Sequence, residues 1–226
     1  MEKKYVSIIL VLLLSGGTLQ ASGFKDGPFV GAVRGGDTRD ADVAIGWRVV
    51  YEYTPHLSIE LSLSHHRDDV AFLMPPPPYD ATFRLETLGL ALGGRIGHRF
   101  GRVAVYGTGG AGYYRMHAKA GSLHLAPNSR QGALPPGVPP MELSANVVNS
   151  PGYHAALGVE VQLPGKWEVF TEYRWIYLDT DITYRKTETF PDPDPATPDV
   201  RRETTRTKSR LDYDHHMIRF GVNRRF

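Results

Sequence analysis

The clearest structural signal in the chain is the run Val43-Ala44-Ile45-Gly46-Trp47-Arg48-Val49-Val50-Tyr51-Glu52-Tyr53. Large apolar side chains alternate along most of it with small or charged ones, and a period of two is typical of a β-strand. Val43, Trp47 and Tyr53 share one face, whereas Arg48 and Glu52 lie on the other. The run also has the length of a tilted strand that crosses a bilayer, which takes about 9–11 residues. It therefore predicts a membrane-crossing strand with an apolar outer face.

The same alternation recurs from Gly27 to the C-terminus. In one segment Leu88 falls on the face opposite Leu85, which predicts a β-bulge between them. The expected strands cover residues 27–36, 41–53, 56–66, 82–97, 102–117, 151–163, 167–184 and 207–226.

The connections between these segments alternate in length. Tight turns are expected near residues 54–56, 99–101 and 164–166, and longer loops at residues 37–40, 67–81, 118–150 and 185–206. Short turns on one side and longer loops on the other are the layout of a membrane barrel. The predicted fold class is therefore all-β, an eight-stranded antiparallel up-and-down transmembrane β-barrel. Both ends of the chain should lie on the short-turn side, which faces the periplasm, and the long loops should be extracellular.

Composition excludes several classes of protein. The 226 residues include no cysteine, so neither a disulfide scaffold nor a thiolate metal site can form. The formal net charge is only +2, which argues against a nucleic-acid partner.

The N-terminus has the features of an export signal. Glu2, Lys3 and Lys4 precede a short apolar run, and Ala21 is a small residue suited to cleavage. Residues 1–21 are therefore predicted to be a signal peptide, and residues 22–226 the barrel domain.

The face opposite the apolar one carries small residues and charges of both signs, which suits a narrow lumen filled by paired charges. An eight-stranded barrel leaves an interior that side chains nearly fill, so we expect these charges to plug the lumen. The alternative is that they line a path for ions or small solutes. The predicted lumen residues are Arg48, Glu52, Glu60, Arg84, Glu86, Arg95, Glu160, Glu172, Arg174 and Arg219.

Aromatic side chains cluster toward the predicted strand ends, as the girdles of membrane barrels do. The girdle at the short-turn end is predicted to hold Phe29, Tyr51, Tyr53, Trp167 and Phe226. The girdle at the other end is predicted to hold Tyr113, Tyr114, Trp175, Tyr177 and Tyr184.

The chain ends in Met217-Ile218-Arg219-Phe220-Gly221-Val222-Asn223-Arg224-Arg225-Phe226. A last strand with Phe220, Gly221 and a C-terminal Phe226 resembles the assembly signal of outer-membrane proteins, with Arg224 standing where that family usually has an apolar residue. The whole mature chain resembles the small eight-stranded barrels of the OmpA/OmpX/OmpW-like outer-membrane group. The resemblance implies insertion by the barrel-assembly machinery, which reads the last strand. It also implies a location in the outer membrane of a Gram-negative-type bacterium, in contact with membrane lipid and lipopolysaccharide.

Two groups of side chains offer imidazole and carboxylate ligands of the kind that suit Zn²⁺. Adjacent histidines on a strand point to opposite faces, however, and the two predicted strands are not neighbours in a simple meander. We therefore expect polar loop ends and lumen lining rather than a metal site, and no cofactor. The groups are His65, His66, Asp68 and Asp69 near the outer end of the third predicted strand, and Asp212, Asp214, His215 and His216 near the outer end of the eighth.

A catalytic constellation is not evident. The sequence lacks a Gly-x-Ser-x-Gly elbow and a His-Glu-x-x-His helix. Ser62, Ser64 and His66 are predicted to face the lumen, away from lipid acyl chains. We therefore expect no enzymatic activity and no catalytic residues.

The loops carry the remaining candidates. Residues 74–79 hold consecutive prolines before Tyr79 and predict a stiff spacer or recognition segment, and residues 118–150 predict an irregular loop. Residues 183–190 and 200–207 predict a hairpin that continues two strands beyond the membrane. Its edge could add a partner strand or touch lipopolysaccharide, or its charges could serve only to prevent self-association. The candidate surface-contact residues are Tyr79, Arg201, Arg202 and Arg206.

These features favour a structural or adhesin-like role, in which the loops contact an extracellular protein or glycan. The first alternative is a small pore or carrier for narrow solutes. A third and less favoured alternative is an enzyme that modifies lipid A.

Overall fold

The computed structural model describes residues 23–35, 41–74, 79–124, 141–191 and 200–226. The predicted signal peptide, residues 1–21, lies outside the described residues. Within them, no helix is long and apolar enough to cross a membrane. The strands are β1 (Phe24–Gly35), β2 (Asp42–Glu52), β3 (Leu57–Met74), β4 (Tyr79–Phe100), β5 (Val103–His124), β6 (Met141–Val147), β7 (Ser150–Gln162), β8 (Trp167–Pro191), β9 (Val200–Asp212) and β10 (His215–Arg225).

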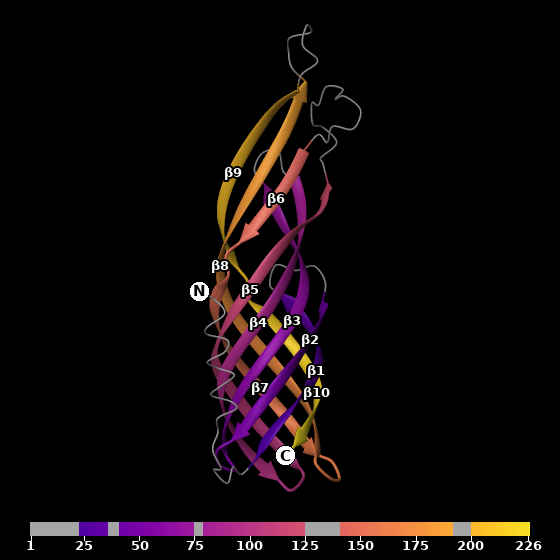
Figure 1. Cartoon of the computed structure of the whole chain (residues 1–226), viewed down its shortest axis with the longest axis vertical. Coiled ribbons are helices and arrows are strands. Elements are labelled where there is room, and N and C mark those ends of the chain that lie inside the picture. Colours follow the sequence, from indigo (N-terminus) through magenta and orange to yellow (C-terminus); the bar gives the residue numbers. More distant parts are fainter. Residues whose placement is uncertain (1–22, 36–40, 75–78, 125–140, 192–199) are drawn as a thin grey trace.

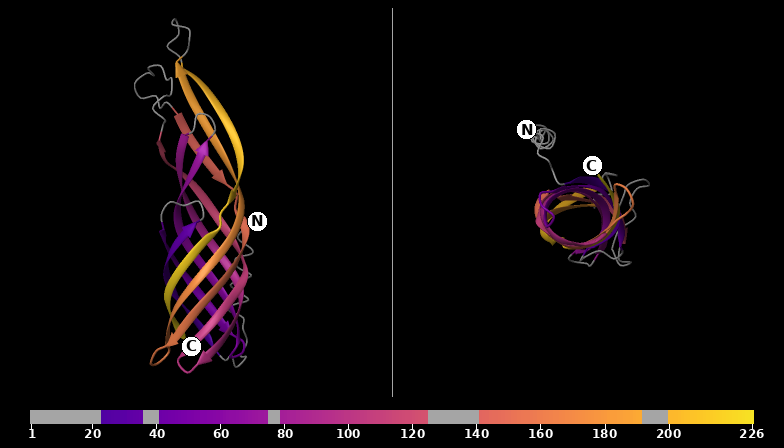
Figure 2. Two further views of the ribbon diagram at one scale, coloured as in Figure 1. Left: turned by 180° about the vertical axis from the view of Figure 1, so that it is seen from behind. Right: turned by 90° about the horizontal axis from the view of Figure 1, so that it is seen from below.

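Eight of these strands close into a ring. The order β10-β1-β2-β3-β4-β5-β7-β8 is completed by pairing of β8 with β10, and the ring is seen end-on in the right-hand view of Figure 2. Every pairing is antiparallel, and β1 meets β10 from Lys25 opposite Arg225 to Gly35 opposite His215. Closure satisfies the backbone hydrogen bonds of all eight strands inside the ring. The predicted eight-stranded barrel is confirmed.

The turns after β2, β4 and β7 lie at one end of the molecule, together with the C-terminus, and the extended ends of β3, β4, β5 and β8 lie toward the other (Figure 1). Gly101 and Gly165 adopt positive φ angles of 60° and 81° within two of these turns, a conformation that favours glycine. We call the two ends the short-turn end and the long-loop end. The predicted long loop at residues 67–81 needs correction, because residues 67–74 belong to β3 and residues 79–81 to β4, and the two strands pair up to Met74 and Tyr79.

At the long-loop end several strands continue beyond the ring. β8 extends far past it and pairs with β9 on one side and with β6 on the other (Figure 1). β3, β4 and β5 also run on as paired strands. An apolar cluster fills the space enclosed by these extensions and the top of the ring. Its members are Phe83, Leu85, Tyr114, Met116, Val147, Ile176, Leu178, Ile182, Tyr184, Leu211 and Tyr213.

Side chains alternate between the two faces of the wall along each described strand of the ring. On β2, for example, Ile45 and Trp47 are exposed whereas Arg48 and Val50 are fully buried. The exposed apolar side chains form a band around the barrel that reaches Leu63 on β3 and Leu88 on β4. A soluble barrel would show the opposite polarity, with apolar side chains inside and polar ones in water.

The strand predictions need several corrections, one of which is that the last predicted strand, residues 207–226, is divided between β9 and β10. The alternation of β4 continues from Phe83 to Arg95 without a break, so the bulge predicted between Leu85 and Leu88 is wrong; the register shifts instead at Ala81/Phe83. Residues 141–147 of the predicted irregular loop form strand β6, and residues 118–124 belong to β5. The predicted hairpin of the last long loop is present as β8 and β9, which pair from Asp179–Asp212 up to Pro191–Val200.

The aromatic girdles also need correction. Tyr53, Trp167 and Phe226 are exposed at the short-turn end, and Tyr113, Trp175 and Tyr177 are exposed toward the other. Phe29, Tyr114 and Tyr184, however, are buried inside the wall. Each stands at a position of its strand whose side chain points inward, and each packs against other interior groups. This packing outweighs the general tendency of aromatic residues to lie at the membrane interface.

Candidate functional site

The middle of the barrel interior holds a network of buried ion pairs. Arg219 on β10 contacts Glu60 on β3 at 2.5 Å and Glu172 on β8 at 2.8 Å. Arg174 on β8 contacts the same two carboxylates at 2.5 and 2.9 Å. Arg48 on β2 donates to Glu160 and, at 3.0 Å, to the hydroxyl of Tyr106. These side chains come from strands around the ring and meet at its centre.

A second layer of the network lies nearer the short-turn end. Glu160 accepts from three cations, because Lys25 lies at 2.6 Å and Arg95 at 2.6 Å in addition to Arg48. Lys25 also contacts Glu52 and Glu168, both at 2.9 Å. Carboxylates and cations therefore lie beside each other throughout this network, which lowers the cost of burying charge.

Eight of the ten predicted lumen residues lie in this network. Arg84 and Glu86 do not, and their assignment to the lumen is wrong. Arg84 is 57% exposed and contacts Asp69 at 3.2 Å on the outer face of the wall, while Phe83 and Leu85 point inward. The physical reason is that this part of β4 has passed beyond the apolar band, where the outside of the wall is polar and its inside apolar.

Sequence reasoning missed several partners in the network. Lys25 precedes the predicted start of the first strand at Gly27. It lies four residues before the buried Phe29, however, and therefore on the same face of the strand. Glu168 lies on the same face of its strand as Glu172, so the alternation could have added it to the predicted lumen residues. Nothing in the alternation of charges marks Tyr106, whose hydroxyl donates to Glu172 at 3.1 Å.

A pocket of about 260 Å³ opens at the short-turn end. It is lined by charged groups of the network, including Arg95 and Glu160, and by His56 and His98 at the rim. The two imidazoles stack with ring centroids 5.3 Å apart. The pocket therefore ends on the ion-pair network.

The long-loop end of the interior holds a different cluster, made of imidazole, carboxyl and phenol groups. His66 and Asp68 of β3 face His215 of β10 and Tyr213 beside it, and the four side chains are at most 1% exposed. The rings of His66 and His215 lie 4.9 Å apart, and the Tyr213 hydroxyl donates to Asp68. Burial raises the pKa of Asp68, which lies beyond the apolar band, to about 7, with help from Asp42 and Asp69. His66 and Asp68 of the first predicted group thus meet His215 of the second, because the narrow lumen brings non-adjacent strands together, whereas Asp69 and His216 lie on the outer side of the wall.

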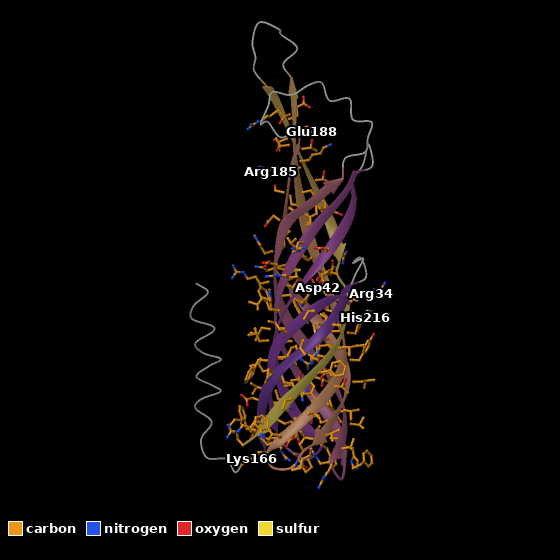
Figure 3. The ribbon with its side chains drawn as sticks, turned by 90° about the vertical axis from the view of Figure 1, so that its right-hand side faces the viewer. Arg34, Asp42, Lys166, Arg185, Glu188 and His216 are labelled. Atoms are coloured by element: carbon orange, nitrogen blue, oxygen red, sulfur yellow. The ribbon has the colours of Figure 1, made fainter. Side chains whose placement is uncertain are left out.

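Outside the ring, the β8–β9 hairpin presents a basic outer face. Arg185, labelled in Figure 3, lies directly opposite Arg206, and Arg202 lies further along the same face. All three are exposed. Lys208 and Arg210 are paired, with Lys208 2.8 Å from Asp181. A hydrogen bond from Arg210 lowers the pKa of Asp179.

The structure therefore places two of the four predicted contact residues. Arg202 and Arg206 are exposed on β9 as expected. The side chains of Tyr79 and Arg201 lie outside the described residues, as do residues 75–78 between β3 and β4.

The C-terminal residues divide between the two faces of the wall. Phe220 and Phe226 are exposed, at 56% and 62%. Gly221 faces inward, where a Cβ would come within 2.4 Å of the Phe170 ring. Gly221 thus has a packing role in addition to any role in assembly.

Taken together, a closed ring with an apolar outer band and a charged, filled interior defines a small outer-membrane β-barrel. The chain belongs to the outer membrane protein beta-barrel domain family, whose profile matches residues 13–226. No curated protein sequence matches it.

Three solved structures share the fold at low sequence identity. The outer membrane protein OprG from Pseudomonas aeruginosa is 16% identical, with a TM-score of 0.63, covering 91% of this chain and 96% of that one. Neisserial surface protein A is 12% identical, with a TM-score of 0.52, covering 92% and 100%. A major outer membrane protein from Thermus thermophilus is 11% identical, with a TM-score of 0.50, covering 90% and 99%. These likenesses concern the fold.

Proposed function

We propose that this outer-membrane barrel is a closed scaffold that holds the β8–β9 hairpin outside the cell for an adhesin-like contact with an anionic glycan. The observation that carries the proposal is the Arg185–Arg206 pair on the exposed face of the hairpin. Like charges directly opposite each other on a sheet are destabilising, so their presence needs a reason. A sulfate or phosphate group placed between two guanidinium groups would remove the repulsion through charge-assisted hydrogen bonds.

The surroundings of the pair support this function. Arg202 lies on the same face, and the cross-strand pair of Thr187 and Thr204 lies between Arg202 and the arginine pair. The two threonine hydroxyl groups are hydrogen-bonded at 3.1 Å and could also bind a sugar. Arg185 follows Tyr177, near the upper edge of the apolar band, by eight residues. This corresponds to about 25 Å of extended strand, well above the membrane surface.

The closed interior favours a surface role over the alternative of a pore. In the described residues, the ion-pair network fills the middle of the ring and the apolar cluster fills its long-loop end. The proposed role is also non-catalytic. Ser62, one of the candidates for a nucleophile, accepts a hydrogen bond of 3.0 Å from Arg174 instead of pairing with a base.

Export and insertion belong to the same proposal. A cleaved signal at residues 1–21 would deliver the chain to the periplasm. The barrel-assembly machinery would then read the last strand through Phe220 and Phe226, whose exposed rings support this role.

The test is binding of folded protein, in lipid nanodiscs, to dextran sulfate and to purified lipopolysaccharide, with neutral dextran as the blank. Replacing Arg185, Arg202 and Arg206 by Gln together should weaken binding of at least one anionic glycan more than tenfold. High salt should abolish the binding, because exposed charges are screened. The control replaces Arg102, Lys166 and Arg224 by Gln, which removes the same charge from exposed sites toward the short-turn end. Equal loss in both triple variants, or wild-type binding no better to anionic glycans than to neutral dextran, would overturn the proposal.

A further inference from the structure

Several polar atoms of the buried cluster at the long-loop end of the lumen have no hydrogen-bond partner. Both ring nitrogens of His66, Nε2 of His215 and Oδ1 of Asp68 are buried and have no hydrogen-bond partner. Unpaired buried polar atoms are costly, and a native structure normally supplies them with water or an ion. Here they gather in one place, from β3 and β10, at the level where Gly35 at the end of β1 pairs with His215. Figure 3 labels the neighbouring pair Arg34 and His216.

We propose that His66, His215 and Asp68 bind a divalent transition-metal ion of the zinc type, with a water in the fourth position. Two imidazoles and one carboxylate are a ligand set that such ions take in proteins. The ion would tie β3 to β10 just below the extensions that carry the hairpin.

The distances are close to those of a metal site. Bonds from zinc to nitrogen or oxygen are about 2.0–2.2 Å, so two ligand atoms on a tetrahedral ion lie about 3.3–3.6 Å apart. Nε2 of His66 and Oδ2 of Asp68 are 3.5 Å apart. The ring centroids of His66 and His215 are 4.9 Å apart, where two imidazoles on one tetrahedral ion would be about 5 Å apart.

The groups around the cluster are those that support metal ligands. Nδ1 of His215 lies 3.3 Å from the backbone oxygen of Tyr213, and donation there leaves Nε2 with its lone pair free for a metal. The Tyr213 hydroxyl donates to Asp68 and holds the carboxylate in place.

As they stand, the described residues include no group of three His, Asp or Glu side chains already arranged around one point. Binding therefore requires a small turn of the rings. The His66 ring can turn without losing a hydrogen bond, because neither of its nitrogens makes one.

The test uses full-length mature protein carrying no histidine tag, refolded and confirmed as folded by heat-dependent gel mobility. Titration with Co²⁺ should give the strong visible absorption of a tetrahedral site with one ion per chain, and Zn²⁺ should displace it. The double variant His66→Ala/His215→Ala should lose the absorption. Tyr213→Phe, which keeps the ring packing, should weaken binding about 10–100-fold.

Two control variants keep the outcome decisive. His65→Ala/His216→Ala removes neighbouring histidines on the outer face, and His56→Ala/His98→Ala removes the stacked pair at the short-turn end. Both should bind cobalt like the wild type. The proposal is overturned if folded wild-type protein gives no tetrahedral signal, or if the signal survives loss of His66 and His215 or disappears with either control pair.

Discussion

Glu160 is the residue that joins the two layers of the interior network. It is fully buried and accepts from Lys25, Arg48 and Arg95, which lie on three different strands. Water does not replace a lost partner easily at such a site, so removing one charge leaves several others without compensation. The network should therefore respond to Glu160 much more than a surface ion pair responds to either of its members.

We expect Glu160→Gln to lower the free energy of unfolding of the barrel in lipid vesicles by about 3–5 kcal/mol, the usual cost of breaking a buried pair. Urea titration of the refolded protein measures this change. Asp181→Asn is the matched control, because it breaks the exposed pair with Lys208 and should cost less than about 1 kcal/mol. Similar costs for both variants would show that the interior is hydrated and that its ion pairs are not structural.

At the scale of the strands, the wall changes its polarity along its length. On β3 and β4 the outward side chains are apolar up to Leu63 and Leu88, and then become charged at Arg67, Asp69 and Arg84. Over the same distance the inward side chains of β4 change from Arg95 to the apolar Leu85 and Phe83, while those of β3 stay polar at His66 and Asp68. The point of inversion marks where the strands leave the membrane.

This account predicts that Leu61→Arg impairs folding into vesicles, because Leu61 lies in the outer band opposite Leu92 and Val49. Arginine on the lipid face near the middle of a bilayer costs about 2–4 kcal/mol. The control on the same strand is Ser58→Arg, which points inward and lines the pocket at the short-turn end. Ser62 would be a poor control, because it is buried against Arg174. If Leu61→Arg and Ser58→Arg fold with equal yield, the orientation of β3 is wrong.

The same inversion explains how far the sequence could predict the structure. Alternation alone located the eight strands of the ring, their inward and outward faces and the turns, because one face meets lipid over the whole span. It assigned Arg84 and Glu86 to the lumen because the polar face was assumed to point inward beyond the membrane as well. It could not place His66 beside His215, because contacts across a lumen depend on barrel width and strand stagger, which local sequence does not encode.

The whole molecule is a closed cylinder, and the long β8–β9 hairpin extends from its long-loop end (Figure 1). The described interior is filled at two levels, by ion pairs between the eight strands and by apolar side chains beneath the hairpin. A filled interior makes the ring rigid. Because β8 continues from the ring without a break and pairs with β9, the hairpin is held in a fixed position above the ring. The central claim is therefore that the barrel is a scaffold and not a conduit.

Single-channel conductance of the refolded mature chain in a planar bilayer tests this claim most directly. Heat-dependent gel mobility should first confirm that the protein is folded. The account predicts no steady openings from folded wild-type protein. Steady, reproducible openings would contradict it and would mean that Arg48, Glu160 and Glu172 line a path for ions.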